Sequence, residues 1–301
     1  MLYQKTLSKS VKLEGIGLHS GQMVRVELHP APADSGVYFF VDGHEIKAAC
    51  ASVFDTTYAT SLMGNGRVVR TVEHLLAALA GLGVDNVRIE VSGSEVPILD
   101  GSAWPFVKAM KDAGLNLQRS PRKYLKILKP VTVLEGDKSA SLLPSPEPRI
   151  TYRIDFAHPL LSDQHFSLGL EQESFEHELC QARTFGFLRD VEMLQKAGLA
   201  QGGSLDNAVV MDDERILNEE GLRYPDEFVR HKMMDAVGDL SLLGLPFIGH
   251  LVADKSGHKL NHRLVREVLS RPDSWILVEG GIAVGDAALG LGMATVGAAG
   301  E

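Results

Sequence analysis

The chain has 301 residues, about twice the length of a typical single domain, so its length predicts two domains. Apolar residues make up 45% and charged residues 23% of the sequence, a composition that excludes a mainly disordered or collagen-like chain. The formal net charge of -9 argues against a general nucleic-acid-binding protein, which would carry a basic excess.

The sequence carries no sign of secretion or of membrane insertion. Residues 1–15 lack the apolar segment of a signal peptide, and no stretch of about 18 strongly apolar residues predicts a membrane span. The two cysteines, Cys50 and Cys180, are too few for a disulfide framework or a four-thiolate zinc site. We therefore expect a cytoplasmic protein that does not insert stably in a membrane.

Residues 1–120 are expected to form a first α+β domain. Alternating apolar residues, with β-branched and aromatic side chains bounded by glycine and proline, predict strands over residues 5–15, 23–31, 36–43 and 86–93. The Gly-Asn-Gly run at residues 64–66 predicts a tight hairpin turn. Apolar residues at helical spacing predict a helix that begins near Thr71 and is stopped by Gly81 and Gly83, and a second helix that Gly114 ends.

Residues 121–275 are expected to form a second α+β domain. The charged, proline-containing stretch 115–126 is typical of a linker and places the domain boundary near residue 120. Strands are predicted over residues 124–136, 139–144 and 149–156, and helices over residues 227–244 and 261–271. Because strands precede helices in both halves, a duplicated unit is predicted. Residues 276–301 are expected to be a flexible tail.

The helix around His231 carries the most specific chemical signal. At about 100° per residue, Asp235 lies about 40° from His231, and Lys232 and Asp239 fall within the same quarter turn. A histidine and an aspartate on one helix face suit a divalent ion such as Zn²⁺. The alternative is an exposed helix face with a His–Asp hydrogen bond.

Three other segments are candidates for the same site. Glu73 and His74 begin a strongly apolar helix. In one interpretation Glu73 is a base and His74 is a third metal ligand; in the other they form a solvated first turn, where a glutamate suits the helix dipole. His258 lies in a glycine-flanked loop and is either a group that titrates near neutrality or a surface residue. The Ala-Arg-Thr-Phe-Gly-Phe run at residues 182–187 is either a site or a packed turn.

Six segments occur together in a fixed order: GIGLHSG, TVEHLLAALAGLGVDN, SEVPILDGSA, ARTFGF, LNEEGLRYPDEFVRHKMMDAVGDL and SGHKLNHRL. From about residue 3 to residue 270 the chain resembles the UDP-3-O-acyl-N-acetylglucosamine deacetylases, the LpxC family of lipid A biosynthesis. The resemblance implies an α+β fold of two domains, each a β-sheet packed against two α-helices, with the active site at the domain interface.

The resemblance also implies a metal site and a set of catalytic roles. It implies Zn²⁺, with Fe²⁺ as the alternative, held by His74, His231 and Asp235, with one position left for water. It assigns Glu73 as general base, Thr184 as the donor to the oxyanion, His258 as general acid, Asp239 as the residue that orients His258, and Lys232 as the contact of the nucleotide diphosphate.

The substrate that the resemblance implies is a small, lipid-linked UDP-sugar, hydrolysed by a monomer that releases acetate. Its acyl chain is expected in an insert at about residues 188–212. The substrate-binding positions assigned by the resemblance are Phe185, Leu188, Val191, Ala200, Gly203, Ser204 and Val210. The loop at residues 63–69 is shorter than in the family, which leaves the contacts of the first domain open. Two rival hypotheses are a zinc deacetylase of another sugar and a metal-free sugar-nucleotide binding protein.

Overall fold

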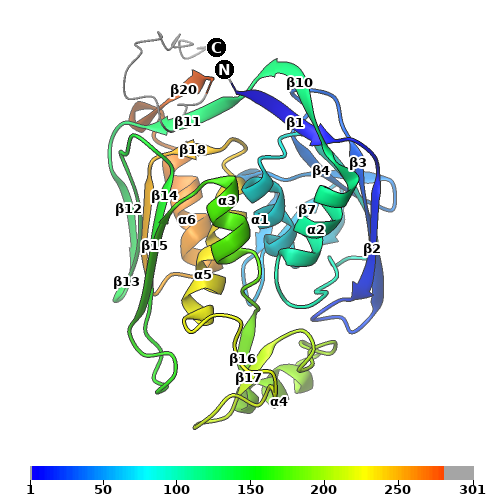
Figure 1. Cartoon of the computed structure of the whole chain (residues 1–301), viewed down its shortest axis with the longest axis vertical. Helices are drawn as coiled ribbons and strands as arrows, with labels where there is room; N and C mark the ends of the chain where they lie inside the picture. The colour runs from blue at the N-terminus through cyan, green and yellow to red at the C-terminus, as the bar shows by residue number, and fades with distance from the viewer. Residues whose placement is uncertain (1, 281–301) are drawn as a thin grey trace.

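The structure, a computed structural model, describes residues 2–280 and is built around two five-stranded sheets with helices packed between them (Figure 1). The first five-stranded sheet has the order β2-β3-β9-β4-β5, in which only β4 and β9 run parallel. Its strands are β2 (Val11–Ile16), β3 (Met23–Pro30), β4 (Val37–Val41), β5 (His44–Lys47) and β9 (Val87–Ser92). In β3, Val24, Val26 and Leu28 alternate with more exposed residues, so one face of the strand joins the core.

The second five-stranded sheet repeats this arrangement. Its order is β12-β13-β19-β14-β15, and only β14 and β19 run parallel. Its strands are β12 (Val131–Glu135), β13 (Lys138–Leu143), β14 (Arg149–Ile154), β15 (Gln164–Gly169) and β19 (His250–Asp254). The identical strand order confirms the duplicated α+β unit that the sequence predicts.

The longer helices other than α4 lie between the two five-stranded sheets (Figure 1). They are α1 (Glu73–Leu82), α2 (Trp104–Ala113), α5 (Glu227–Ser241) and α6 (His258–Leu269). Parallel strands need a long crossover, which α1 supplies between β4 and β9 and α5 supplies between β14 and β19. Nearly all of α1 is buried because it packs against α5 at the centre of the molecule. The two-domain α+β class is thus as expected.

Two segments differ from their sequence-based predictions. Residues 115–121, expected in a linker, form β10 (Leu115–Pro121), which pairs with β1 (Tyr3–Leu7). Residues 276–279, expected in the tail, belong to β20 (Trp275–Glu279), which pairs with β11 (Lys123–Ile127). In both cases a partner strand distant in sequence supplies the hydrogen bonds, and local composition does not reveal such a partner. The rest of the expected tail, residues 281–301, lies outside the described residues, and the boundary near residue 120 stays a prediction.

Shorter elements complete the fold. The Gly-Asn-Gly hairpin is confirmed, because β7 and β8 pair across Gly64 and Arg67, with Asn65 and Gly66 at positive φ. The remaining elements are η1 (Cys50–Ser52), β6 (Val53–Asp55), β7 (Ser61–Gly64), β8 (Arg67–Val69), α3 (Gln172–Ser174), η2 (Phe175–Leu179), β16 (Phe185–Phe187), α4 (Leu188–Lys196), β17 (Val209–Met211), β18 (Phe247–Ile248) and η3 (Pro272–Ser274). Among the described helices, none has the length and apolar character needed to cross a bilayer.

Candidate metal centre and active site

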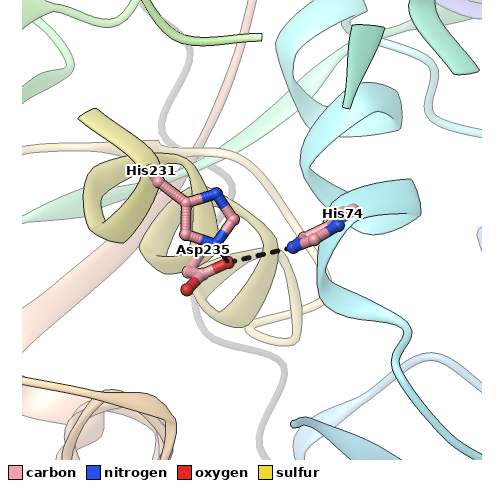
Figure 2. Close-up of side chains that lie close together, drawn as sticks. All are labelled: His74, His231 and Asp235. Carbon is pink, nitrogen blue, oxygen red and sulfur yellow. Dashed lines mark ion pairs between the residues drawn. The ribbon is translucent and has the colours of Figure 1, made fainter. Parts of the chain in front are cut away.

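Three buried side chains from the two central helices converge on one point (Figure 2). His74 comes from the first turn of α1, and His231 and Asp235 lie one turn apart on α5. The Nε2 atoms of His74 and His231 each lie 3.4 Å from Asp235 Oδ1, and the three ligand atoms lie within 4.8 Å of one another. The two imidazoles meet edge to face, with ring centroids 5.1 Å apart. The three side chains that the sequence singled out as ligands are therefore brought together.

The hydrogen bonding of this cluster suits a cation. Within the described part of the chain, Asp235 Oδ1 is buried and has no hydrogen-bond donor, an arrangement that costs free energy unless a positive charge faces the oxygen. The Nδ1 atom of His231 donates to the carbonyl of Ala182 at 3.1 Å, which leaves Nε2 as an acceptor directed at the cluster.

The protonation states also suit metal binding, which requires neutral imidazoles and an ionised carboxylate. Burial lowers the pKa of His231 to about 3, so its ring is neutral. Burial alone would raise the pKa of Asp235, but the Lys232 ammonium and the His258 imidazolium oppose it, and that pKa lies well below its usual range. Lys232 donates from Nζ to Asp235 Oδ2 at 2.9 Å, and it leaves the other oxygen to the cluster. This donor set fits a divalent cation such as Zn²⁺.

Close packing of α1 on α5 makes the convergence possible. A Cβ atom added at Gly238 would lie 2.1 Å from the carbonyl oxygen of Glu73, a separation that no real side chain tolerates. Only glycine at this crossing lets the backbone of α1 lie directly on α5. The backbone of Glu73 touches α5 at this point, so the adjacent His74 is brought beside the ligands of α5.

Glu73 places a second carboxylate beside the cluster. Its Oε2 atom accepts a hydrogen bond from the backbone N–H of Thr60 at 3.0 Å, and its Oε1 atom lies 3.9 Å from His258 Nε2. The side chain is 3% exposed. Burial raises the pKa of Glu73 above its usual value, although His258 and His74 oppose the shift. A carboxylate of raised pKa is a better proton acceptor near neutrality.

His258 faces the same space from α6. Its Nδ1 atom lies 2.9 Å from Asp239 Oδ2, and its Nε2 atom lies 3.9 Å from Asp235 Oδ2. Burial alone would lower the pKa of His258, but Asp239 outweighs it and raises the pKa to about 9. The expectation that His258 lies in a loop was wrong, because Gly257 precedes the helix and His258 is the first residue of α6. It is therefore a fixed imidazolium rather than a mobile one.

Two residues that donate hydrogen bonds to Asp239 were not predicted from the sequence. Thr60 donates from its hydroxyl to Asp239 Oδ1 at 2.6 Å, and Asn261 donates from Nδ2 to Asp239 Oδ2 at 2.9 Å. The side chain of Asn261 is in turn held by the Ser256 hydroxyl at 2.6 Å. Asn261 lies three residues after His258 on α6, but the predicted helix began only at residue 261, so helical spacing did not link the two residues. Thr60 comes from the first half of the chain, and no local pattern connects it to Asp239 on α5.

The segment around Thr184 is tied to α5 by a buried ion pair. Glu227, fully buried one turn before His231, accepts from both the backbone N–H and the Nε atom of Arg183 at 2.9 Å. The neighbouring Thr184 is fixed by its backbone, which donates to the Gly101 carbonyl at 2.8 Å. The ring of Phe185 packs edge to face on that of His231, with centroids 6.1 Å apart. Phe185 is thereby held next to His231, and Thr184 precedes it directly in the chain.

The insert extends beyond the helices with β16, α4 and β17 (Figure 1). It carries the six candidate lining residues on α4, in the loop after α4 and on β17, namely Leu188, Val191, Ala200, Gly203, Ser204 and Val210. Leu188 is 44% exposed, whereas Ala200 is buried. The loop packs on the first half of the chain, because Gly202 donates from its backbone N–H to the Leu18 carbonyl at 3.0 Å. Both halves thus contribute to the base of the insert.

Comparisons with known proteins agree with this geometry. A family model described as UDP-3-O-acyl N-acetylglycosamine deacetylase (LpxC) matches residues 4–270. The chain is 52% identical over 279 residues to a UDP-3-O-acyl-N-acetylglucosamine deacetylase of Myxococcus xanthus (strain DK1622), with 91% of this chain and 89% of that protein covered. It is 48% identical to proteins of the same name from Syntrophus aciditrophicus (strain SB), with 91% and 89% covered, and Pseudomonas entomophila (strain L48), with 92% and 94% covered.

Proposed function

The chain belongs to the UDP-3-O-acyl-N-acetylglucosamine deacetylase (LpxC) family, and we propose that it hydrolyses the N-acetyl group of a UDP-3-O-acyl-N-acetylglucosamine in lipid A biosynthesis. The reaction releases acetate and leaves a free amine on the sugar. The observation that carries this proposal is the convergence of two imidazoles and a carboxylate beside a separate Glu73–His258 pair. That combination is suited to hydrolysis of an unactivated amide.

The residues that would hold a metal ion are His74, His231 and Asp235. Their nitrogen and oxygen donors suit Zn²⁺, and Fe²⁺ accepts the same set. When bound, such an ion lowers the pKa of water and polarises the carbonyl of the scissile amide. Lys232 keeps Asp235 ionised, since the two side chains form a buried ion pair.

Glu73 and His258 divide the proton transfers of the proposed reaction. The Glu73 carboxylate, with its raised pKa, takes the proton from the attacking water. The His258 imidazolium donates a proton from Nε2 to the sugar nitrogen, which would otherwise be a poor leaving group. Asp239 holds Nδ1 of His258, which keeps the ring charged and directs Nε2 towards Glu73 and Asp235. Glu73 Oε1 and His258 Nε2 lie 3.9 Å apart, close enough for both side chains to act on one tetrahedral centre.

Substrate contacts are proposed around this centre. Thr184, beside Phe185 and the ligand helix, supplies a hydroxyl donor to the oxyanion. Lys232 is the remaining cation of the cluster and contacts the diphosphate. We further propose that the insert, lined by Leu188, Val191, Ala200, Gly203, Ser204, Val210 and Phe185, holds the acyl chain. The enzyme would act in the cytoplasm as a monomer on this small lipid-linked UDP-sugar.

The decisive experiment measures metal content and acetate release on the same purified chain. We expect about one zinc or iron per chain, acetate released from acylated UDP-N-acetylglucosamine, and much slower release from the non-acylated sugar. Equal rates on the two sugars would argue against the acyl-binding insert. A chain that contains no metal and remains inactive after zinc is added would refute the proposed deacetylase activity. It would favour the hypothesis of a sugar-nucleotide binding protein.

A further inference from the structure

Thr60 lies at the centre of the candidate site, although it belongs to neither the ligand set nor the acid–base pair. It precedes β7 in the first half of the chain and is 1% exposed. All three of its polar groups are used. The backbone N–H donates to Glu73 Oε2 at 3.0 Å, the hydroxyl donates to Asp239 Oδ1 at 2.6 Å, and the carbonyl accepts from Val72 at 3.2 Å, at the start of α1.

The hydroxyl of Thr60 decides which way the Asp239 carboxylate faces. Its single proton goes to Asp239 Oδ1 at 2.6 Å rather than to His258 Nδ1, which lies 3.3 Å away. With Oδ1 engaged, only Oδ2 is left for His258 Nδ1 and for Asn261 Nδ2, each at 2.9 Å. Without the hydroxyl, nothing in the described chain would hold Oδ1, and the carboxylate could rotate away from the imidazole.

The backbone of Thr60 holds the other member of the acid–base pair, Glu73. Its N–H holds one oxygen of Glu73, while its carbonyl secures the first turn of α1, the helix that carries Glu73 and His74. Glu73 belongs to the first half of the chain, and Asp239 and His258 belong to the second. A single residue therefore touches the carboxylate of one half and the dyad of the other, across the junction that separates them.

We propose that Thr60 is a positioning residue for the deacetylation, which sets the placement of His258 relative to Glu73 by holding Asp239 with its hydroxyl and Glu73 with its backbone N–H. The inference rests on the proposed function, because it assumes that these two groups exchange protons with the substrate. It predicts that loss of the hydroxyl lowers kcat through His258 and leaves substrate binding unchanged.

The test compares Thr60→Val, which removes the hydroxyl but keeps the shape and the backbone N–H, with Thr60→Ser, which keeps the hydroxyl. We expect Thr60→Val to lower kcat about 10- to 100-fold, the range in which a small displacement of a catalytic group falls, with KM changed less than about threefold. Thr60→Ser should stay within about threefold of the unmodified chain. Thr132→Val is the matched control, since Thr132 lies on the exposed face of β12 and its hydroxyl hydrogen-bonds that of Ser141 at 2.9 Å.

A double-mutant cycle separates positioning of His258 from a general structural role. If Thr60 acts through His258, Thr60→Val should cost almost nothing further in a His258→Ala background. The full loss in that background would overturn the proposal, as would a loss confined to KM or a serine variant as impaired as the valine variant. Circular dichroism and urea unfolding verify that each variant is folded, and Thr60→Ala, judged by the same criteria, replaces a valine variant that does not fold.

The same acetate-release assay distinguishes a failure of this proposal from a failure of the proposed function. If the unmodified chain releases no acetate from acylated UDP-N-acetylglucosamine, the proposed function fails. If the unmodified chain is active and Thr60→Val is as active as Thr132→Val, the function stands and the role of Thr60 is refuted.

Discussion

Replacement of Gly238 by alanine should separate the two ligand helices. The new Cβ would lie 2.1 Å from the Glu73 carbonyl oxygen and 2.9 Å from its carbonyl carbon. Because α1 must move away until ordinary contact is restored, we expect a displacement of about 1 Å, which a close-packed core resists at a cost of about 1–3 kcal/mol of stability. His74 moves with α1, and metal sites tolerate only about 0.2 Å of change in ligand distance. Zinc affinity should therefore fall by about 10- to 100-fold.

The assay measures zinc affinity by chelator competition and stability by urea unfolding on the same preparations. Gly81→Ala is the matched control, because its Cβ would lie 2.1 Å from the Phe175 ring, a clash of the same size on α1, the helix that carries His74. Residue 81 lies about 10 Å along α1 from His74. The control should lose stability but retain more of its zinc affinity than the Gly238 variant.

Two results would contradict this reasoning. If Gly238→Ala binds zinc as tightly as the unmodified chain, the close approach of α1 and α5 does not set the ligand geometry. If Gly81→Ala loses zinc affinity to the same extent, the loss reflects general destabilisation of α1 rather than the position of His74.

Three further outcomes follow from the site. Asp235→Ala should lose bound metal, as measured by metal analysis after dialysis, and full retention would remove Asp235 from the ligand set. His258→Ala should keep its metal while kcat falls about 10²- to 10⁴-fold, the contribution typical of a general acid, and loss of metal would contradict that assignment. Because Asp239 outweighs burial and raises the pKa of His258 to about 9, the acid form persists through neutrality, and kcat should fall as the pH rises through about 9. The pH profile of His258→Ala should lack this decline, and an unchanged profile would assign it to another group.

The sequence carried enough information to find the part of the site that one helix provides. His231 and Asp235 are four residues apart, so helical geometry alone places them on one face, and in the structure His231 Nε2 lies 3.4 Å from Asp235 Oδ1. Asn261, three residues from His258, was missed because the predicted helix began at residue 261 and left His258 in a loop. These contacts are local and depend on helix geometry.

Contacts between distant segments were not predictable in this way. For His74 the residues left a third ligand and a solvated first turn both open, and only the family resemblance chose the ligand, because its position depends on the packing of α1 against Gly238. Thr60 reaches Asp239 across 179 residues of sequence, and no periodicity encodes that hydrogen bond. Likewise β10 was expected to be part of a linker, since the charged, proline-containing stretch 115–126 gives no sign of the pairing with β1. Tertiary contacts override local propensity in each case.

The candidate ligands are divided between α1 of one half and α5 of the other, so a cation held by all three belongs energetically to the junction itself. Any ion bound there adds its binding free energy to the docking of the halves, about 4 kcal/mol at a thousand times Kd. Removal of the ion by a chelator would then lower the free energy of unfolding of the whole molecule as well as inactivate it. By the same linkage, an inhibitor that coordinates the ion would stabilise the contact between the two halves. The melting temperature would then rise with the fraction of sites that the inhibitor occupies.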